Sequence, residues 1–182
     1  MSMDTMKLIE DHLDSMWFAA MRLTKNRRDA EDLVQEACLR AIENLDSLRS
    51  KDKVKGWLLK ILTNTFINRY RKGLSEGVVL GGEDDFLESV FYKNGKYIDL
   101  EREIFSKVMD EEVNDALDNL PIEFRMAVLL VDIEELSYRE VEEILSISPG
   151  TLASRLYRGR RLLRDALYGY AAKKGFLREV KI

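Results

Sequence analysis

The sequence is poor in the residues that build covalent or metal-bound frameworks. Its 182 residues include one cysteine, Cys38, and one histidine, His12. A single cysteine excludes an internal disulfide, and one residue of each kind is too few for a zinc site or a cysteine–histidine catalytic pair. We therefore expect no zinc or thiolate metal site and no cysteine–histidine catalytic site. Cys38 falls among apolar helical positions, so we expect it to be a small buried residue.

Long apolar runs and prolines are equally scarce. No stretch approaches the about 18 consecutive apolar residues that a transmembrane helix needs, and no secretory signal opens the chain. We therefore expect a cytoplasmic protein. Only Pro121 and Pro149 interrupt a sequence in which helix-compatible residues dominate, so we expect an almost all-α fold.

An excess of positive charge is also absent, since the formal net charge is −4. This charge argues against a uniformly basic nucleic-acid coat protein. The average conceals strong segregation, because cations dominate residues 49–72 and carboxylates dominate residues 83–118. Such asymmetry indicates separate faces or segments for separate partners.

The stretch 136–164 has the pattern of two short helices joined by a tight turn. Ser137 and Glu140 are spaced as a capping box at the start of the first helix. The apolar stripe of that helix consists of Tyr138, Val141, Ile144 and Leu145. Ser148 followed by Pro149 is typical of an N-cap and a first helical position, so a second helix begins there.

This second helix has two contrasting faces. Its inner face consists of Leu152, Leu156, Gly159 and Leu163, and its outer face includes Ser154, Tyr157, Arg158 and Arg161. A helix that packs through an apolar side and carries arginines outside suits the major groove of DNA. The alternative is a solvated arginine face on an ordinary helical hairpin.

Two helices are predicted in the first part of the chain, over residues 4–25 and 29–48, the second with Asp29 as its cap. A largely polar stripe on the second helix includes Asp32, Gln35 and Glu36. From the residues alone, this stripe is best explained as a solvated acidic face.

A third helix, predicted over residues 57–72, follows a basic loop at 49–55. One of its faces consists of Trp57, Lys60, Asn64, Asn68 and Arg71. Single-stranded DNA needs such a set, because an aromatic ring stacks on bases, amides reach base edges and cations neutralise phosphates. The alternative is that Trp57 packs into the core and the asparagines are merely exposed.

Glycines and carboxylates then interrupt the helical pattern over residues 74–105, which we predict to be a flexible acidic linker. A loop of this length is improbable inside one compact domain. We therefore expect two small helical domains, at 1–73 and 106–172, and a tail at 173–182. Further helices are predicted over 100–119 and 122–134.

These segments resemble bacterial sigma factors of the extracytoplasmic-function (ECF) group of the sigma-70 family. Their promoter-melting domain, region 2, is similar to DAEDLVQEACLRAIENLDSL at 29–48 and KGWLLKILTNTFINRYRK at 55–72. Their domain for the upstream promoter element, region 4, is similar to LPIEFRMAVLLVDIEELSYREVEEIL at 120–145 and SPGTLASRLYRGRRLLR at 148–164. Within the group, the wording at 61–72 and 120–128 most resembles the subgroup that answers thiol-oxidative stress.

The resemblance implies a protein that directs RNA polymerase core to promoters and opens the −10 element, without a cofactor or catalysis of its own. It assigns −10 contacts to Lys53, Val54, Lys55, Trp57, Asn64 and Asn68, and we add Lys60 and Arg71 from the same helix face. It assigns −35 contacts to Ser154, Arg155, Tyr157 and Arg158, and we add Thr151 and Arg161 from the same helix. It assigns Asp32, Gln35 and Glu36 to the clamp helices of the largest polymerase subunit, in place of a merely solvated face. The flap of the second-largest subunit and an anti-sigma factor are further implied partners.

Two positions depart from the family's pattern. Many relatives have Asp where this chain has Asn68, and some have Arg where it has Ala153, so the promoter sequence is not transferable from them. An alternative function is a stand-alone helix-turn-helix regulator, but the face from Trp57 to Arg71 would then have no purpose. A metal-dependent nuclease would need clustered carboxylates, and the clusters at 83–85 and 110–112 lie in or beside the linker.

Overall fold

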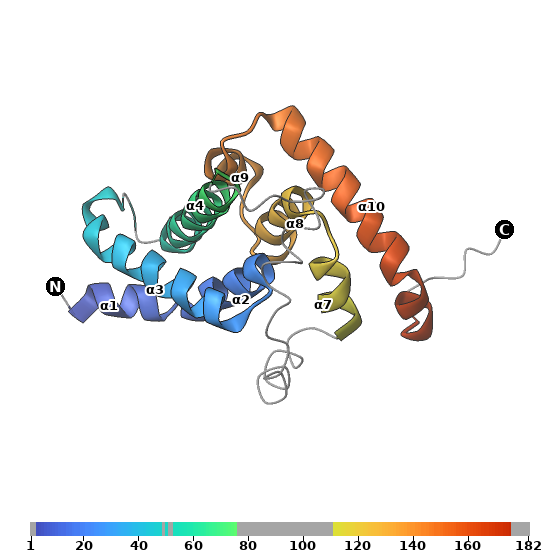
Figure 1. The fold of residues 1–182 in the computed structure, drawn as a ribbon, viewed down its shortest axis with the longest axis horizontal. Coiled ribbons are helices and arrows are strands. Elements are labelled where there is room, and N and C mark those ends of the chain that lie inside the picture. The colour runs from blue at the N-terminus through green and yellow to red at the C-terminus, as the bar shows by residue number, and fades with distance from the viewer. Residues whose placement is uncertain (1–2, 49, 51–52, 76–110, 176–182) are drawn as a thin grey trace.

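The structure is a computed structural model that describes residues 3–48, 50, 53–75 and 111–175 (Figure 1). Every regular element within these residues is helical, which confirms the predicted all-α fold. The acidic linker predicted for 74–105 lies outside the described residues, except for its first two positions. Among the described helices, none is both long and apolar enough to cross a membrane.

Within its described residues, the first half of the chain forms α-helices and a short 3-10 turn. These are α1 (Met3–Glu10), α2 (Leu13–Thr24), α3 (Arg27–Glu43), η1 (Leu45–Ser47) and α4 (Val54–Ser75). Side chains of α2, α3 and α4 bury against one another, and the fully enclosed ones include Met16, Leu23, Leu33, Leu58 and Leu62. Alanines on the inner side of α3, such as Ala30, Ala37 and Ala41, are 0% exposed and let the neighbouring helices approach closely.

Several predicted helix boundaries in this half are wrong. The helix expected over 4–25 is interrupted at His12, whose backbone (φ −122°, ψ 6°) leaves the helical region. The cap of α3 is Asn26, not Asp29, because the Asn26 side chain accepts a hydrogen bond from the Asp29 N–H at 3.2 Å. That helix ends at Glu43 and not near Leu48, since the Asn44 side chain donates to the Arg40 carbonyl at 2.8 Å.

The third predicted helix begins earlier than expected. Helix α4 starts at Val54, so the last part of the predicted basic loop forms its first turn. Gly56 therefore lies inside the helix and does not precede it.

The second half contains α7 (Glu111–Asp118), α8 (Ile122–Val128), a π-helical turn η4 (Leu129–Ile133), α9 (Tyr138–Leu145) and α10 (Pro149–Lys173). The predicted capping box of Ser137 and Glu140 is confirmed, as is the N-cap at Ser148. Tyr138, however, is 48% exposed and does not belong to the buried stripe of α9. It lies in the first turn of α9, and its hydroxyl turns outward toward Arg160 of α10.

The two halves pack against each other. Helix α4 lies beside α9, and α2 lies beside α8 (Figure 1). Arg125 of α8 is 2% exposed and donates to three carbonyl oxygens: those of Arg22 at 3.0 Å, Asp118 at 2.8 Å and Leu120 at 2.7 Å. A buried guanidinium that donates to carbonyls of both halves fixes α8 against α2.

Candidate nucleic-acid interface

The outer face of α10 is set by how its inner face packs. Leu152 and Leu156 are buried, and Gly159 lies so close to α8 that an added Cβ would be 2.9 Å from Val128 Cγ2. The side chains predicted to contact the −35 element and left exposed by this packing are Thr151, Ser154, Tyr157, Arg158 and Arg161. Arg155 is half-buried.

The arginines of α10 do not all have the same surroundings. Arg160 donates to both carboxylate oxygens of Asp132, at 3.0 and 2.6 Å, and these hydrogen bonds raise its pKa. Arg155 lies 3.5 Å from a Glu123 oxygen. Arg158 and Arg161 are exposed, and neither makes a side-chain hydrogen bond or ion pair within the part of the chain that the structure describes. These two cations are therefore available to a partner without breaking an existing contact.

A shallow hollow lies at the start of α10. Its lining includes Ser148, Thr151, Ser154, Arg155 and Arg158. Ser148 Oγ accepts from the Thr151 N–H at 3.2 Å, so the cap holds the first turn in place. Backbone N–H groups at a helix start, together with hydroxyls and cations, favour an anion such as a DNA phosphate.

The predicted −10 face of α4 is largely accessible. Lys60, Asn68 and Arg71 are exposed, and Asn64 is half-buried. Trp57 is half-buried, because its ring packs partly against the core, and its Nε1–H donates to Ser47 Oγ at 3.0 Å.

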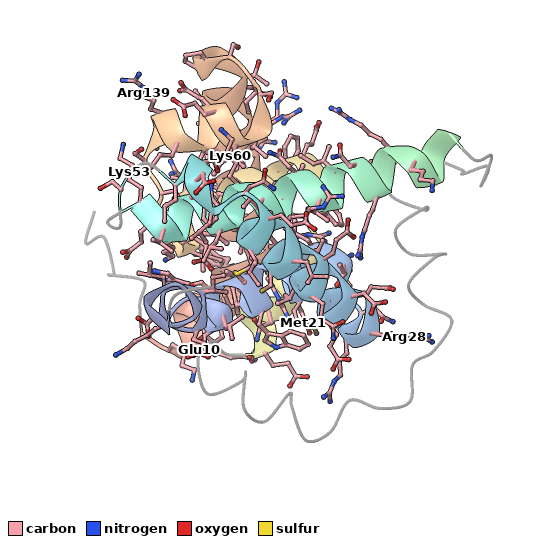
Figure 2. All side chains as sticks on the ribbon, turned by 90° about the vertical axis from the view of Figure 1, so that its left-hand side faces the viewer. Glu10, Met21, Arg28, Lys53, Lys60 and Arg139 are labelled. Carbon is pink, nitrogen blue, oxygen red and sulfur yellow. The ribbon has the colours of Figure 1, made fainter. Side chains whose placement is uncertain are left out.

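The three residues at the start of α4 are placed differently from one another. Lys53 is exposed, and Figure 2 shows it with Lys60 near the start of α4, close to α9. Val54 is only 1% exposed. Lys55 Nζ donates to the Glu134 backbone carbonyl at 2.9 Å and lies 3.0 Å from the Glu134 carboxylate. In this arrangement Val54 and Lys55 are turned toward the protein interior.

The predicted polymerase-binding residues lie on α3, where Asp32 and Gln35 are exposed and Glu36 is half-buried. Glu36 accepts from Arg69 Nε at 2.8 Å and from Arg40 at 2.6 Å. Burial alone would raise the pKa of Glu36, but the hydrogen bonds and charges of Arg69 and Arg40 lower it. The carboxylate is therefore held ionised and in one orientation.

Two neighbours of this surface received no role from the sequence. Arg69 also donates to the Asp32 carbonyl at 3.0 Å, and so ties α4 to α3. Leu39 is 62% exposed, one helical turn beyond Gln35. Leu39 lies on the same stripe of α3 as Asp32, Gln35 and Glu36, so a partner that binds this stripe would also contact it. Its place on the stripe follows from helical spacing in the sequence, whereas the Arg69 contact depends on the tertiary fold.

Groups for metal binding or thiol chemistry are not assembled. No cluster of three or more histidine, cysteine or carboxylate residues that could hold a metal ion occurs within residues 3–48, 53–75 and 111–175. Cys38, predicted to be a small buried residue, is half-buried, and burial raises the pKa of its thiol.

Comparison with known protein families matches both halves. The family pattern described as Sigma-70 region 2 matches residues 8–74, and that described as Sigma-70, region 4 matches residues 110–163. The two matches occur in the order expected from the resemblance and contain all the residues predicted to contact DNA or polymerase.

Individual relatives agree with the family match. The chain is 34% identical over 175 residues to the ECF RNA polymerase sigma factor SigE of Mycolicibacterium smegmatis, a match that covers 92% of this chain and 63% of that protein. The chain thus spans less than two thirds of that relative. It is 31% identical to the RNA polymerase sigma factor SigV of Bacillus subtilis, covering 87% of this chain and 88% of that protein.

Solved structures resemble the fold as a whole. The sigma factor RpoE from Bartonella quintana, crystallised with the anti-sigma factor NepR, is 26% identical and superposes with a TM-score of 0.67, covering 92% of this chain and 98% of that one. CnrH, solved with the cytosolic domain of CnrY, shares the fold at 20% identity and a TM-score of 0.59. The chain belongs to the ECF group of the sigma-70 family of RNA polymerase sigma factors.

Proposed function

We propose that this sigma factor directs RNA polymerase to promoters through two DNA contacts, one on each half of the chain. Helix α10 reads the −35 element as a duplex, and α4 captures unpaired bases of the −10 element. The observation that carries this proposal is the pair of exposed polar faces on otherwise packed helices. The face of α10 presents Arg158 and Arg161 on a helix that fits the major groove. The face of α4 presents Lys60, Asn64 and Asn68 along one line.

The −35 contact both positions the protein on the duplex and reads the base sequence. The start of α10 enters the major groove, where Arg158 and Ser154 reach base edges while Thr151 and Arg155 contact phosphates. Each well-oriented bidentate side chain–base pair is worth about 1–3 kcal/mol of discrimination. Arg160 is excluded from this role because it is already paired with Asp132.

At the −10 element, strand opening is driven by the binding energy of the captured bases, so the chain needs no catalytic group. Flipping a base out of the stack costs a few kcal/mol, which capture on α4 offsets. The amides of Asn64 and Asn68 suit base edges, and Lys60 and Arg71 suit phosphates. The exposed part of Trp57 offers a surface on which a base can stack.

The partners follow from the same surfaces. We assign the α3 surface of Asp32, Gln35, Glu36 and Leu39 to the clamp helices of the largest polymerase subunit, and the second half to the flap of the second-largest subunit. The protein would then act in the cytoplasm, where RNA polymerase and the chromosome are. An anti-sigma factor is the proposed regulator, which the anti-sigma complex of the Bartonella quintana relative supports.

We also propose that the regulon answers thiol-oxidative stress, on the strength of the sequence wording at 61–72 and 120–128. The thiol sensor would then be a partner, because the pKa of Cys38 is raised by burial and its thiol is poorly reactive at neutral pH. Diamide treatment of the source cells should induce the regulon. No induction by diamide would contradict this assignment.

The division between the two halves is tested with core polymerase and two single variants. Asn64→Ala should leave formation of the closed complex largely intact but reduce opening of the −10 element, measured by permanganate reactivity of unpaired thymines. Arg158→Ala should weaken closed-complex formation by about tenfold, as expected for a lost contact worth about 1–3 kcal/mol. If both variants fail at the same step, the proposed division is wrong.

A further inference from the structure

The start of α4 is covered by the second half of the same chain. Lys55 reaches from α4 to Glu134, where it meets both the backbone carbonyl at 2.9 Å and the carboxylate at 3.0 Å. The Glu134 side chain is 4% exposed. A carboxylate this buried needs a cation or donors, because leaving it unpaired would carry a large desolvation cost. Lys55 supplies the cation.

Close packing surrounds this ion pair. Val54 and Leu136 are 1% and 8% exposed. A Cβ at Gly56 would lie 3.5 Å from Glu140 Oε1 and 3.6 Å from Leu136 Cδ2, which is ordinary van der Waals contact. Hydrogen bonds from Ser137 and, more weakly, the charge of Lys53 lower the pKa of Glu140. Two carboxylates thus face the cationic, N-terminal end of a helix, where the helix dipole also favours negative charge.

A second contact joins the halves at another place. Arg22 of α2 donates to Asp118 Oδ2 at 3.1 Å and to Asn114 Oδ1 at 3.3 Å, both on α7. The Arg22 side chain is 13% exposed, so this ion pair is screened less than a surface pair. Its residues belong to none of the predicted DNA or polymerase contacts.

We propose that Glu134, Leu136 and Glu140 form an acidic docking face for the start of α4, and that this docking withholds Lys55 from DNA in the free protein. The inference rests on the proposed function, in which Lys53, Val54 and Lys55 contact the −10 element. Charge complementarity and close fit identify the occupant as the first half of the same chain. Polymerase and promoter DNA open the docked form because they bind only the undocked one.

The test uses the full chain without polymerase. The probe is a fluorescent single-stranded oligonucleotide that carries the non-template −10 segment of a promoter mapped with the reconstituted holoenzyme. Glu134→Gln removes the charge that holds Lys55 and should tighten binding of this probe by about tenfold, or about 1.4 kcal/mol. Glu143→Gln makes the same change of charge on α9, at a side chain that is 61% exposed and that, among the described residues, forms an ion pair with Arg139 alone. Figure 2 shows Arg139 pointing away from α4, so this control should leave binding unchanged.

A second variant separates docking from any local effect of position 134. Arg22→Gln breaks the ion pair between α2 and α7, a second contact between the halves, and should also tighten probe binding. Small-angle scattering should give a larger radius of gyration for both variants than for the wild type and the control, with unchanged helical content by circular dichroism. If neither variant binds more tightly, or the control gains as much, the docking face is refuted.

This outcome is distinguishable from failure of the proposed function. Scattering measures docking whether or not the chain directs transcription. If the wild type initiates transcription with core polymerase but Glu134→Gln and Arg22→Gln resemble it in probe binding and size, only the docking inference fails. If the wild type supports no initiation, the proposed function itself fails.

Discussion

Arg158 and Arg160 lie two positions apart on α10 and have different surroundings. Arg158 is exposed, whereas Arg160 is fixed by Asp132 of η4. The sequence predicts an arginine-rich helix, but which arginine is already paired depends on a residue 28 positions away. The same limit applies to Glu36, whose partner Arg69 is 33 positions distant. The sequence therefore predicts which charged residues lie on a helix face, but not which of them are already paired within the protein.

Local contacts within one turn were predictable in detail, and the capping box of α9 is the clearest case. Glu140 accepts from the Ser137 N–H at 2.9 Å and from its hydroxyl at 2.6 Å. Ser137 Oγ accepts in return from the Glu140 N–H at 3.3 Å. Spacing along the sequence is sufficient here because all the groups lie within four consecutive residues.

Glu140→Ala should lower the free energy of unfolding by about 1 kcal/mol at pH 7, as the loss of a helix cap does. Hydrogen bonds from Ser137 lower the folded-state pKa of Glu140 below its ordinary value of 4.5. The stabilisation is therefore fully present above pH 4.5 and is lost as the pH falls through the lowered value. Urea unfolding of wild type and variant as a function of pH measures the difference. A difference that persists unchanged at pH 3, or one equally large for Glu143→Ala, would contradict this account.

Helices were predicted more reliably than their ends. The pattern of apolar residues places α3, α4, α9 and α10 close to where they occur. The errors concern caps and breaks, such as Asn26 in place of Asp29 and the interruption at His12. Several residues near each end could serve as a cap, and tertiary packing decides which one does.

Helix α10 provides a matched pair of glycines. At Gly159, an added Cβ would lie 2.9 Å from Val128 Cγ2 and 3.3 Å from Phe124 Cβ, whereas at Gly169 no atom lies within 4 Å. Gly159→Ala should lower the free energy of unfolding by about 1–2 kcal/mol, since overpacking exceeds the gain in helix propensity. Gly169→Ala should raise it by about 0.5–1 kcal/mol. Chemical denaturation of both variants measures the two changes, and a stabilised Gly159→Ala would show that α8 and α10 are not in close contact.

The arrangement of the halves is the property least accessible from sequence. Segregated charge and the glycine-rich segment predict two domains, and the family matches at 8–74 and 110–163 fall on the two sides of that segment. Nothing in the pattern indicates that Lys55 and Glu134, 79 positions apart, would meet. That contact depends on how the surfaces of the two folded halves fit together. It places a predicted DNA-binding residue under the other half of the chain.

At the scale of the whole molecule, recognition requires both halves to act together on one promoter. Each face alone is small, and the net charge of −4 provides little non-specific attraction to DNA. The free chain should therefore bind promoter duplex weakly, and selective initiation should appear only with core polymerase. A stand-alone helix-turn-helix regulator would behave in the opposite way.

Reconstituted transcription tests this central claim most directly. Purified core polymerase is incubated with genomic DNA fragments, with and without this chain, and the transcript 5′ ends are mapped. We predict that the chain creates new start sites preceded by two shared sequence blocks at a constant spacing, near −35 and −10, and that core alone produces none of them. Absence of such starts, together with tight binding of the free chain to a duplex site, would contradict the account.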